Sequence, residues 1–368
     1  MPSRTLKSKV ITLTLIAVVA ILPLQFVGQQ ANFVPKAQTV SFPFSPLAGP
    51  SVTTDSNFSI IWITDTQYLS ESYPLYYNSL CRWIVNNAAT YNVKMVIHTG
   101  DIVNDEGSQL QWANANNSMS ILLDAGIPYC WNAGNHDFNA TCWIGDQFTA
   151  FNGTFMSDKP YWVSSQDNSM DTAVHFDVSG WDFLIVNLAY QANDSDLAWA
   201  NGILDAHPNS HAIVATHAYL NRTGGYESWA DHFREVVLAT HSNVFLTLNG
   251  HYYPTDGVRT TVGGRNELMF NRQDQDNEMG SASLRILTFD TANDTLSVRT
   301  FVIYANTFLT DSNNQFSLNT TFHNDSPQDA KVPEFPDMAV AVLCLSMATS
   351  VVIILRIRLK QQKSFSKY

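Results

Sequence analysis

Apolar runs of strand length alternate with stretches of helical spacing over the first two thirds of the chain. The stretch 75–91 is apolar at Leu75, Leu80, Trp83, Ile84 and Ala88, which is the spacing of one helix face. The predicted strands are 58–63, 94–98, 127–131, 212–216 and 244–248, and the predicted helices are 75–91, 108–125 and 229–239. Strands that alternate with helices predict a buried and partly parallel β-sheet.

The pattern changes after Gly257. Helical spacing stops, and apolar runs follow at 258–262, 268–270, 284–289 and 296–303. These runs predict a mainly antiparallel second sheet that packs on the first. Residues 306–336 are rich in Asn, Ser, Thr and Asp and poor in apolar residues, which predicts a flexible polar stalk.

Each end of the chain carries an uncharged apolar run with basic residues on its outer side. Residues 10–24 follow Arg4, Lys7 and Lys9, as in a secretory signal or an uncleaved anchor. Residues 338–355 form a run of 18 residues, which is about the shortest helix that crosses a bilayer. The positive-inside rule then places both termini in the cytoplasm and the body between them on the extracellular side of the membrane. A buried core helix is the alternative for either run.

These patterns divide the chain into five predicted segments. They are 1–30 as a signal peptide or N-terminal anchor, 40–304 as the folded domain, 305–337 as a polar stalk, 338–355 as a transmembrane helix and 356–368 as a basic cytoplasmic tail. The C-terminal run and its basic tail are also compatible with a cell-surface sorting signal that is cut and re-anchored.

The body between the apolar runs is strongly acidic. The two ends, 1–30 and 338–368, hold eight of the 20 basic residues and no acidic ones, so the body carries 12 basic and 32 acidic residues, a net charge of −20. Such a charge repels polyanions, which argues against a nucleic-acid polymer as partner. Nine Asn-x-Ser/Thr triplets suit an exported glycoprotein. Cys130 and Cys142 are equally compatible with a disulfide and with two free thiols.

Polar motifs follow five of the predicted strands. They are Asp65-Thr66-Gln67, Gly100-Asp101, Gly134-Asn135-His136-Asp137, His217 and Gly250-His251. Because the carboxyl ends of parallel strands meet at one edge of a sheet, we expect these motifs to converge. Each residue alone has a structural explanation, such as a turn cap or a hydrogen-bonded histidine. Two Asp, one Asn and three His together indicate a metal site.

This combination of motifs resembles the calcineurin-like metallophosphoesterase superfamily over roughly residues 58–303. The resemblance implies an α/β fold of two mixed β-sheets packed face to face with flanking helices, a four-layer sandwich. It also implies two divalent metal ions, drawn from Mn²⁺, Fe²⁺, Zn²⁺ and Mg²⁺, and a hydroxide between them that attacks phosphorus.

The family pattern also implies roles for individual residues. The implied metal ligands are Asp65, Gln67, Asp101, Asn135, His217 and His251, with Asp101 bridging the two ions. His136 matches the histidine beside the substrate, which stabilises the transition state or protonates the leaving group. Asp137 is implied as the partner that orients His136 or, alternatively, as a cap of the following segment.

Two positions depart from the family pattern. Gln67 stands in the place of the histidine of Asp-x-His, and Tyr253 stands in the place of the second histidine of Gly-His-x-His. An amide oxygen binds a transition metal more weakly than imidazole does, and a protonated tyrosine is a poor ligand. Both changes concern the first metal, so we expect that site to be weak or selective for a hard ion such as Mn²⁺ or Mg²⁺.

The sequence therefore predicts an exported, membrane-tethered, metal-dependent phosphoesterase that acts on small or medium phosphomonoesters or phosphodiesters. The alternative is a degenerate member of the fold that binds metal or a phosphorylated ligand without turnover. Gln67 and Tyr253 are the residues that motivate the alternative.

Overall fold

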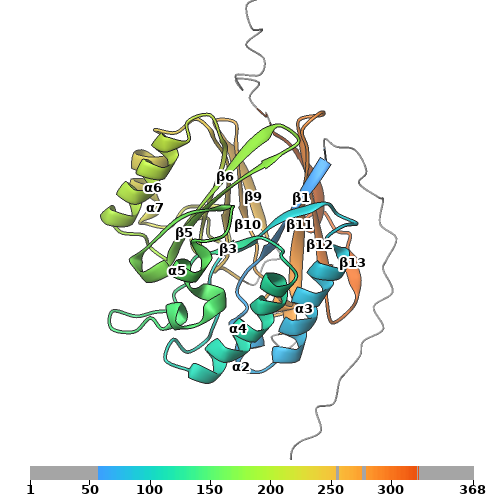
Figure 1. The fold of residues 1–368 in the computed structure, drawn as a ribbon. Coiled ribbons are helices and arrows are strands. Elements are labelled where there is room, and N and C mark those ends of the chain that lie inside the picture. Colours follow the sequence, from blue (N-terminus) through green and yellow to red (C-terminus); the bar gives the residue numbers. More distant parts are fainter. Residues whose placement is uncertain (1–56, 254–256, 276–278, 321, 323–368) are drawn as a thin grey trace, which may run out of the picture. The chain divides into compact units, whose positions relative to one another are not determined.

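In the described part of the chain, two mixed β-sheets of seven strands each are flanked by helices (Figure 1). The structure is a computed structural model that describes residues 57–253, 257–275, 279–320 and 322. The predicted signal or anchor (1–30), the predicted transmembrane helix (338–355) and the basic tail (356–368) lie outside the described residues. Among the described residues, no helix is both long and apolar enough to cross a membrane.

The first sheet has the strand order β13–β12–β11–β1–β2–β3, and β14 also pairs with β12. Its strands are β1 (Asn57–Ile63), β2 (Val93–His98), β3 (Tyr129–Trp131), β11 (Ser283–Asp290), β12 (Thr295–Val302), β13 (Thr307–Leu309) and β14 (Gln315–Asn319). Strands β1, β2 and β3 run parallel, whereas β11 pairs antiparallel with β1. The carboxyl ends of the three parallel strands therefore lie at one edge.

The second sheet has the order β4–β5–β6–β7–β8–β10–β9. Its strands are β4 (Trp162–Gln166), β5 (Asp171–Val178), β6 (Trp181–Leu188), β7 (His211–Thr216), β8 (Val244–Asn249), β9 (Val258–Val262) and β10 (Arg265–Met269). Strands β6, β7, β8 and β10 run parallel. Parallel neighbours need crossover connections, and helices supply those from β6 to β7 and from β7 to β8.

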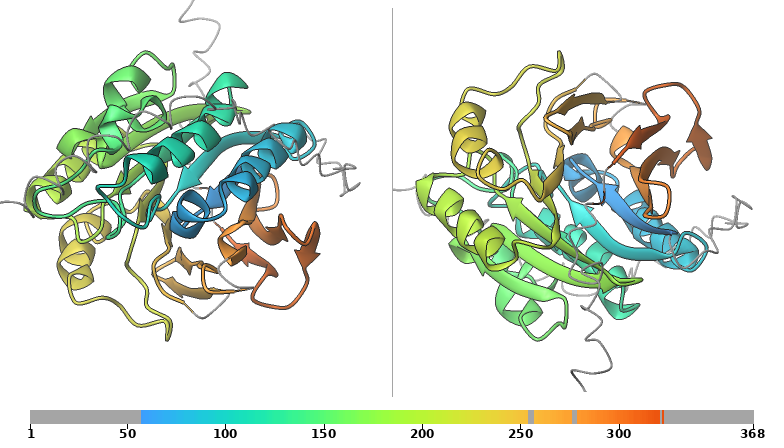
Figure 2. Two further views of the ribbon diagram at one scale, coloured as in Figure 1. Left: turned by 90° about the horizontal axis from the view of Figure 1, so that it is seen from below. Right: turned by 90° about the horizontal axis from the view of Figure 1, so that it is seen from above.

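Helices cover the outer faces of both sheets (Figures 1 and 2). The α-helices are α2 (Gln67–Glu71), α3 (Pro74–Asn87), α4 (Gln109–Asp124), α5 (Gly153–Met156), α6 (Asp194–Ala206) and α7 (Ala230–Phe233). Single turns of other helix types are η1 (Gly145–Gln147), η2 (Thr149–Phe151), η3 (Asp167–Ser169), η4 (Arg234–Leu238) and η5 (Met279–Ser281). Helix α7 runs into the π-helical turn η4, so the helix predicted over 229–239 is present but irregular.

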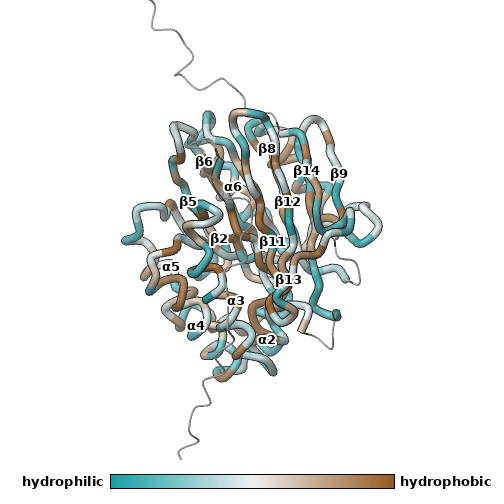
Figure 3. Tube along the Cα trace, turned by 90° about the vertical axis from the view of Figure 1, so that its right-hand side faces the viewer, coloured by the Kyte–Doolittle hydropathy of each residue, from teal (hydrophilic) through white to brown (hydrophobic). Residues whose placement is uncertain are grey.

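Alternate side chains of each central strand enter different cores. On β6, Phe183 and Ile185 join the cluster between the two sheets, whereas Leu184 and Val186 join the cluster under α6 and α7. A strand buried on both faces reads as a continuous apolar run, and such runs identified β1, β2, β7 and β8 in the sequence, although β6 was missed. Figure 3 shows the apolar residues concentrated along these strands.

The second half of the chain is arranged differently from the prediction. The strands after Gly257 do not form a sheet of their own, because β9 and β10 join β8 while β11 and β12 join β1. The segment predicted as a stalk from residue 305 starts with two strands, β13 and β14, both paired with β12. Phe322 is also buried in the core between the sheets. The folded domain thus extends beyond residue 304, and residues 323–337 lie outside the described part.

Candidate metal centre

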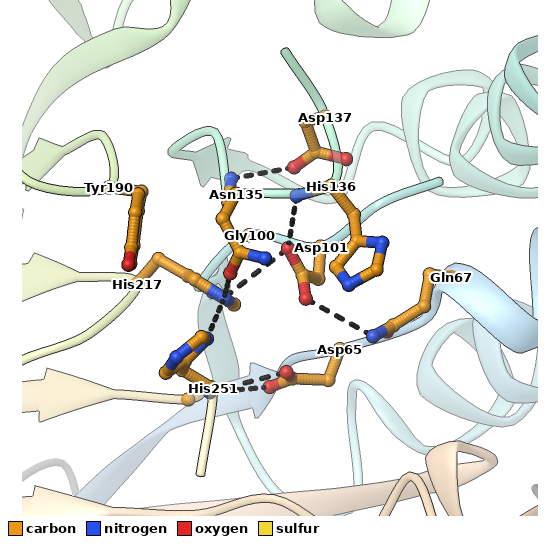
Figure 4. A network of polar contacts seen from close by, with 12 residues as sticks. Asp65, Gln67, Gly100, Asp101, Asn135, His136, Asp137, Tyr190, His217 and His251 are labelled. Atoms are coloured by element: carbon orange, nitrogen blue, oxygen red, sulfur yellow. Dashed lines mark hydrogen bonds and ion pairs between the residues drawn. The ribbon is translucent and has the colours of Figure 1, made fainter. Parts of the chain in front are cut away.

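Six of the sequence-predicted site residues meet where strands of both sheets end (Figure 4). Asp65 follows β1, Asp101 follows β2, and Asn135 follows β3. His217 follows β7 directly, and His251 follows β8. Gln67 enters from the first turn of α2 and donates from Nε2 to Oδ2 of Asp101 at 3.1 Å. The predicted convergence on one edge is therefore present in the fold.

Three of these residues hold an uncommon backbone conformation. Asp65, Asp101 and His251 have φ angles of 51°, 52° and 73°, in the left-handed region that disfavours residues with a Cβ. Such strain persists only where the surrounding structure enforces it, and it concentrates at functional sites. Here each turn bends the chain straight out of its strand and aims the side chain across the edge.

The side chain of His217 lies at the centre of one set of ligand atoms. Its Nδ1 is 2.8 Å from the carbonyl oxygen of Thr99, so in the neutral ring Nδ1 carries the proton and Nε2 presents its lone pair. Nε2 lies 3.1 Å from Oδ1 of Asn135, 3.1 Å from Nδ1 of His251 and 3.3 Å from Oδ1 of Asp101. Ligands that share one ion at about 2.1 Å are roughly 3.0–3.4 Å apart. These four atoms fit one divalent metal.

A second set of oxygens faces the other side of Asp101. The carboxylate of Asp65 accepts hydrogen bonds from Oγ1 of Thr64 at 2.6 Å and from the backbone N–H of His251. Gln67 is buried, and its Oε1 has no hydrogen-bond partner. Its Nε2 faces Asp101, so the unpaired oxygen could bind a cation between the two aspartates only after the side-chain amide turns around. Tyr253 is 43% exposed, which gives no support to it as a ligand.

Two glycines allow the close approach of these loops. A Cβ at Gly134 would lie 2.2 Å from Oδ1 of Asp101. A Cβ at Gly250 would lie 2.2 Å from Oδ2 of Asp65. Both contacts are closer than real Cβ atoms come, so any other residue would displace a carboxylate. The glycines of the motifs therefore serve the position of the two aspartates.

Buried carboxylates and histidines shift one another's pKa values at the centre. Burial, with a contribution from Asp101, raises the pKa of Asp65 to about 7. Burial alone would lower the pKa of His217, but the attraction of Asp101 outweighs it and raises the pKa to about 9. Burial, with repulsion from His217, lowers the pKa of His251 to about 4. A bound cation would neutralise the carboxylates and keep His217 in its neutral, ligating form.

Asp137 does not orient His136. Its carboxylate accepts hydrogen bonds from the backbone N–H groups of Ile102, Val103 and Gly134, at 2.7, 2.9 and 2.7 Å. Figure 4 shows it on the side of the loop away from the His136 ring. The predicted pairing with His136 is thus wrong. Asp137 instead ties the loop after β2 to the loop after β3, since it bonds the amides of both.

The ring of His136 is held by a backbone group instead. Its Nδ1 is 3.1 Å from the carbonyl oxygen of Asn104, which fixes the proton on that nitrogen in the neutral ring. Its backbone N–H donates to Oδ1 of Asp101 at 3.0 Å. The ring is half-buried and lies beside Asp101 (Figure 4). His136 therefore has one free ring nitrogen next to the candidate metal ligands.

Two further side chains at the centre carry no sequence motif. The Tyr190 ring stands 5.4 Å from the His251 ring and 6.0 Å from the His217 ring, measured between centroids. The buried Gln273 accepts a hydrogen bond from Nε2 of Gln67. Tyr190 follows β6, a strand that the sequence analysis did not identify, so the end of that strand is the signal that could have found it. Cys130 and Cys142 are both free, with Cys130 buried in β3.

The chain has a relative among known bacterial proteins. The uncharacterized protein YvnB of Bacillus subtilis (strain 168) is 34% identical over 262 residues, which is 67% of this chain and 20% of that protein. The chain thus spans about a fifth of the length of this relative.

Two solved structures are also similar. Purple acid phosphatase PPD1 from yellow lupin (Lupinus luteus) is 12% identical with a TM-score of 0.46, over 73% of this chain and 55% of that chain. GAP50, the anchor in the inner membrane complex of Plasmodium, is 11% identical with a TM-score of 0.46, over 72% of this chain and 90% of that chain. At TM-scores below 0.5 neither likeness bears on function.

The sequence model named calcineurin-like phosphoesterase matches residues 58–253, which is more than half of the chain. This match covers all the sequence-predicted site residues, from Asp65 to His251. The chain belongs to the calcineurin-like phosphoesterase family.

Proposed function

We propose that the protein is an exported, membrane-tethered phosphoesterase that uses two divalent metal ions to hydrolyse phosphomonoesters or phosphodiesters. The observation that carries the proposal is the position of Nε2 of His217, within 3.1–3.3 Å of ligand atoms of Asn135, His251 and Asp101. Family membership supports the reaction class.

The residues divide into two ligand sets that share Asp101. Asn135, His217 and His251 would hold one metal together with Oδ1 of Asp101. Asp65 and Gln67 would hold the other, on the side of Oδ2 of Asp101. When bound, two such cations lower the pKa of a water molecule and stabilise negative charge on phosphoryl oxygens.

His136 is the candidate for proton transfer. Because Nδ1 donates to the carbonyl of Asn104, Nε2 is the nitrogen that can face a substrate oxygen. The protonated ring can donate a hydrogen bond to a phosphoryl oxygen, or a proton to the leaving group. The backbone contact holds the ring in one orientation, which is what general acid catalysis requires.

The substrate is a small or medium phosphoester. The charge of −20 on the body repels long polyanions, whereas the cations of the centre attract a phosphate group locally. Export and tethering are supported by the apolar runs at 10–24 and 338–355 with their basic flanks. Protease digestion of intact cells tests the location, since a tethered body outside the cell is cut while the cytoplasmic tail is protected.

A metal-binding member without turnover is the second candidate. Gln67 replaces a histidine, and its Nε2 rather than its oxygen faces Asp101. The side-chain amide would have to turn around to ligate a metal. A protein that binds one metal at His217 and none at Asp65 would bind metal without turning over a substrate.

The test combines metal content with turnover. The full chain, purified without chelators, is analysed for metals and assayed with Mn²⁺ on a chromogenic monoester and diester. Two equivalents of metal, with turnover that Asp101→Asn and His136→Ala abolish, support the enzyme. His232→Gln is the matched control, because that histidine is exposed and pairs only with Asp194 in the described part. Tight binding of metal with no turnover under any divalent ion supports the second candidate.

A further inference from the structure

A second acidic cluster lies away from the metal centre, between the start of β5 and the start of α6. Asp167, Asp171 and Asp196 each offer one carboxylate oxygen, and these oxygens lie within 4.8 Å of one another. Asp171 and Asp196 are buried. Asp171 follows the turn η3, and Asp196 belongs to the capping box at the start of α6. Among the described residues, no Lys or Arg forms an ion pair with any of the three.

One oxygen in this cluster has no hydrogen-bond partner among the described residues. Oδ1 of Asp171 accepts from the backbone N–H of Ala189 at 2.7 Å. Oδ2 of Asp171 is fully buried and makes no hydrogen bond. A buried carboxylate oxygen normally has a donor or a cation beside it, because its desolvation otherwise costs several kcal/mol. The Asp171 carboxylate lies close to those of Asp167 and Asp196, and of these Asp196 accepts hydrogen bonds from Nε2 of Gln166 and from the backbone N–H of Asn193. Burial, with repulsion from the two acids, raises the pKa of Asp171 well above its usual value.

We propose that Asp167, Asp171 and Asp196 bind a calcium ion, at a site separate from the phosphoesterase centre. Calcium takes carboxylate oxygens at about 2.3–2.6 Å, so two oxygens on one ion are at most about 5 Å apart, as found here. The cluster contains no histidine or cysteine, which argues against zinc. Water completes the six to eight ligands that calcium accepts.

The position of this site links it to the metal centre. Asp171 accepts a hydrogen bond from the backbone N–H of Ala189. The next residue, Tyr190, packs its ring beside those of His251 and His217. The backbone N–H of Tyr190 donates to the carbonyl of Ala133, directly before Gly134 and Asn135. A cation at Asp171 would therefore fix the segment that carries Tyr190, and it acts as a structural support rather than in the reaction.

Asp167→Asn is the decisive variant. Asp167 is exposed and has φ of 48°, a conformation that asparagine tolerates well, so the variant removes a ligand and a charge without straining the fold. Asp177→Asn is the matched control, because Asp177 is also an exposed aspartate and lies on β5, the strand that begins with Asp171. Both variants are made in the full chain and again with Asp101→Asn, which weakens binding at the phosphoesterase centre.

Calcium binding is measured by titration calorimetry, and terbium luminescence provides a second probe. Trp143 donates from Nε1 to the carbonyl oxygen of Asn168 at 2.8 Å, so this ring can sensitise a terbium ion bound beside it. In the Asp101→Asn background, we expect the protein to bind one equivalent of calcium. Added calcium should displace bound terbium and reduce its luminescence. Affinity falls at least tenfold with Asp167→Asn and is unchanged with Asp177→Asn. No calcium uptake in that background, or equal loss in both variants, overturns the proposal.

Thermal melting of Asp171→Asn distinguishes a calcium ligand from a carboxylate that only holds the backbone of Ala189. Without calcium, this variant should melt at or above the temperature of the parent, because it removes an uncompensated buried charge. With calcium, the parent should melt higher. If Asp171→Asn lowers the melting temperature equally with and without calcium, the carboxylate serves only to hold Ala189, and the proposal is wrong.

Discussion

Thr99 connects His217 to the opposite side of the metal centre. Its carbonyl oxygen accepts from Nδ1 of His217 at 2.8 Å, while its hydroxyl donates to Oγ1 of Thr64 at 2.7 Å. Thr64 in turn donates to Oδ2 of Asp65 at 2.6 Å. One residue thus supports a ligand of each proposed metal, through its backbone on one side and its side chain on the other.

Thr99→Val separates these two roles, because valine keeps the carbonyl and removes the hydroxyl. We expect the metal on the Asp65 side to bind roughly 10–100-fold more weakly, as is usual when a group behind a ligand is lost. The metal at His217 should keep its affinity. A metal titration that resolves two equivalents measures both affinities. His217→Gln should instead weaken the metal at His217 and leave the metal on the Asp65 side unchanged. Equal weakening of both equivalents would contradict the separate supports.

Gln67→His restores the imidazole that most of the family carries at this position. Imidazole is a stronger ligand for Mn²⁺, Zn²⁺ and Fe²⁺ than an amide oxygen. We expect the metal on the Asp65 side to bind at least roughly tenfold more tightly, a step typical of changes around a metal site. Dialysis against graded free Mn²⁺ measures the change. Gln273→Ala is the control, since it frees the Gln67 amide without adding a ligand.

His136 and Asp137 are neighbours in sequence with opposite roles, and two variants distinguish them. Asp137→Ala leaves three backbone N–H groups without their acceptor, so we expect a loss of roughly 3 kcal/mol in the free energy of unfolding. His136→Ala should leave the urea midpoint nearly unchanged and remove turnover. Stability lost in His136→Ala and retained in Asp137→Ala would reverse these roles.

The metal-free protein should lose stability as the pH rises above 6.5. Burial raises the pKa of Asp65 to about 7, so the folded state keeps a proton that the unfolded state has already released, and stability falls as the pH rises from about 4 to about 7. The pKa of His217 is raised to about 9 by Asp101 despite burial, so its stabilising charge is lost as the pH rises through 9. The lowered pKa values of His251 (about 4) and His98 (about 3) reduce stability only below pH 6.5.

Calorimetry of chelator-treated protein between pH 6.5 and 9 measures this effect. The melting temperature should fall by at least roughly 2–4 °C, the shift that about 1 kcal/mol produces in a protein of this size. Added metal should reverse the trend, because metal ligation competes with protons and strengthens with pH. His217→Gln should flatten the metal-free profile. A metal-free melting temperature that rises with pH would contradict these assignments.

The ligands were predictable because the sequence marks the ends of buried strands. Asp65, Asp101 and His251 each come shortly after a continuous apolar run, and strand ends converge by topology alone. The direction of a side chain within a loop is not encoded in this way. Asp137 is adjacent to His136 yet points to the amides of another loop, and only the register of the two loops decides this. Gln273 reaches Gln67 across 206 positions, a contact that no local pattern marks.

The end of the domain was missed for a related reason. Strand β14 alternates exposed and half-buried residues and has little apolar content of its own. Its stability comes from pairing with β12, a partner that the polar composition of the segment does not reveal. Asn266 strengthens the attachment, since its Nδ2 donates to the carbonyl oxygen of Asn319 at 2.9 Å. Composition alone therefore predicted a stalk where the chain completes a sheet.

Phe322 provides the test of this boundary. Its ring is 2% exposed and stands 5.8 Å from both Trp181 and Phe245, measured between centroids. Removal of a buried phenylalanine ring costs about 3–5 kcal/mol, so Phe322→Ala should lower the free energy of unfolding by that amount. Urea unfolding measures the loss. Phe155→Ala is the control, because Phe155 is 44% exposed and should cost under about 1 kcal/mol. If both variants unfold at the same urea concentration as the parent, residue 322 adds nothing to the core and the domain ends near residue 304 as the composition suggests. A selective loss in Phe322→Ala would mean that any shortened form of the protein must retain residues up to 322.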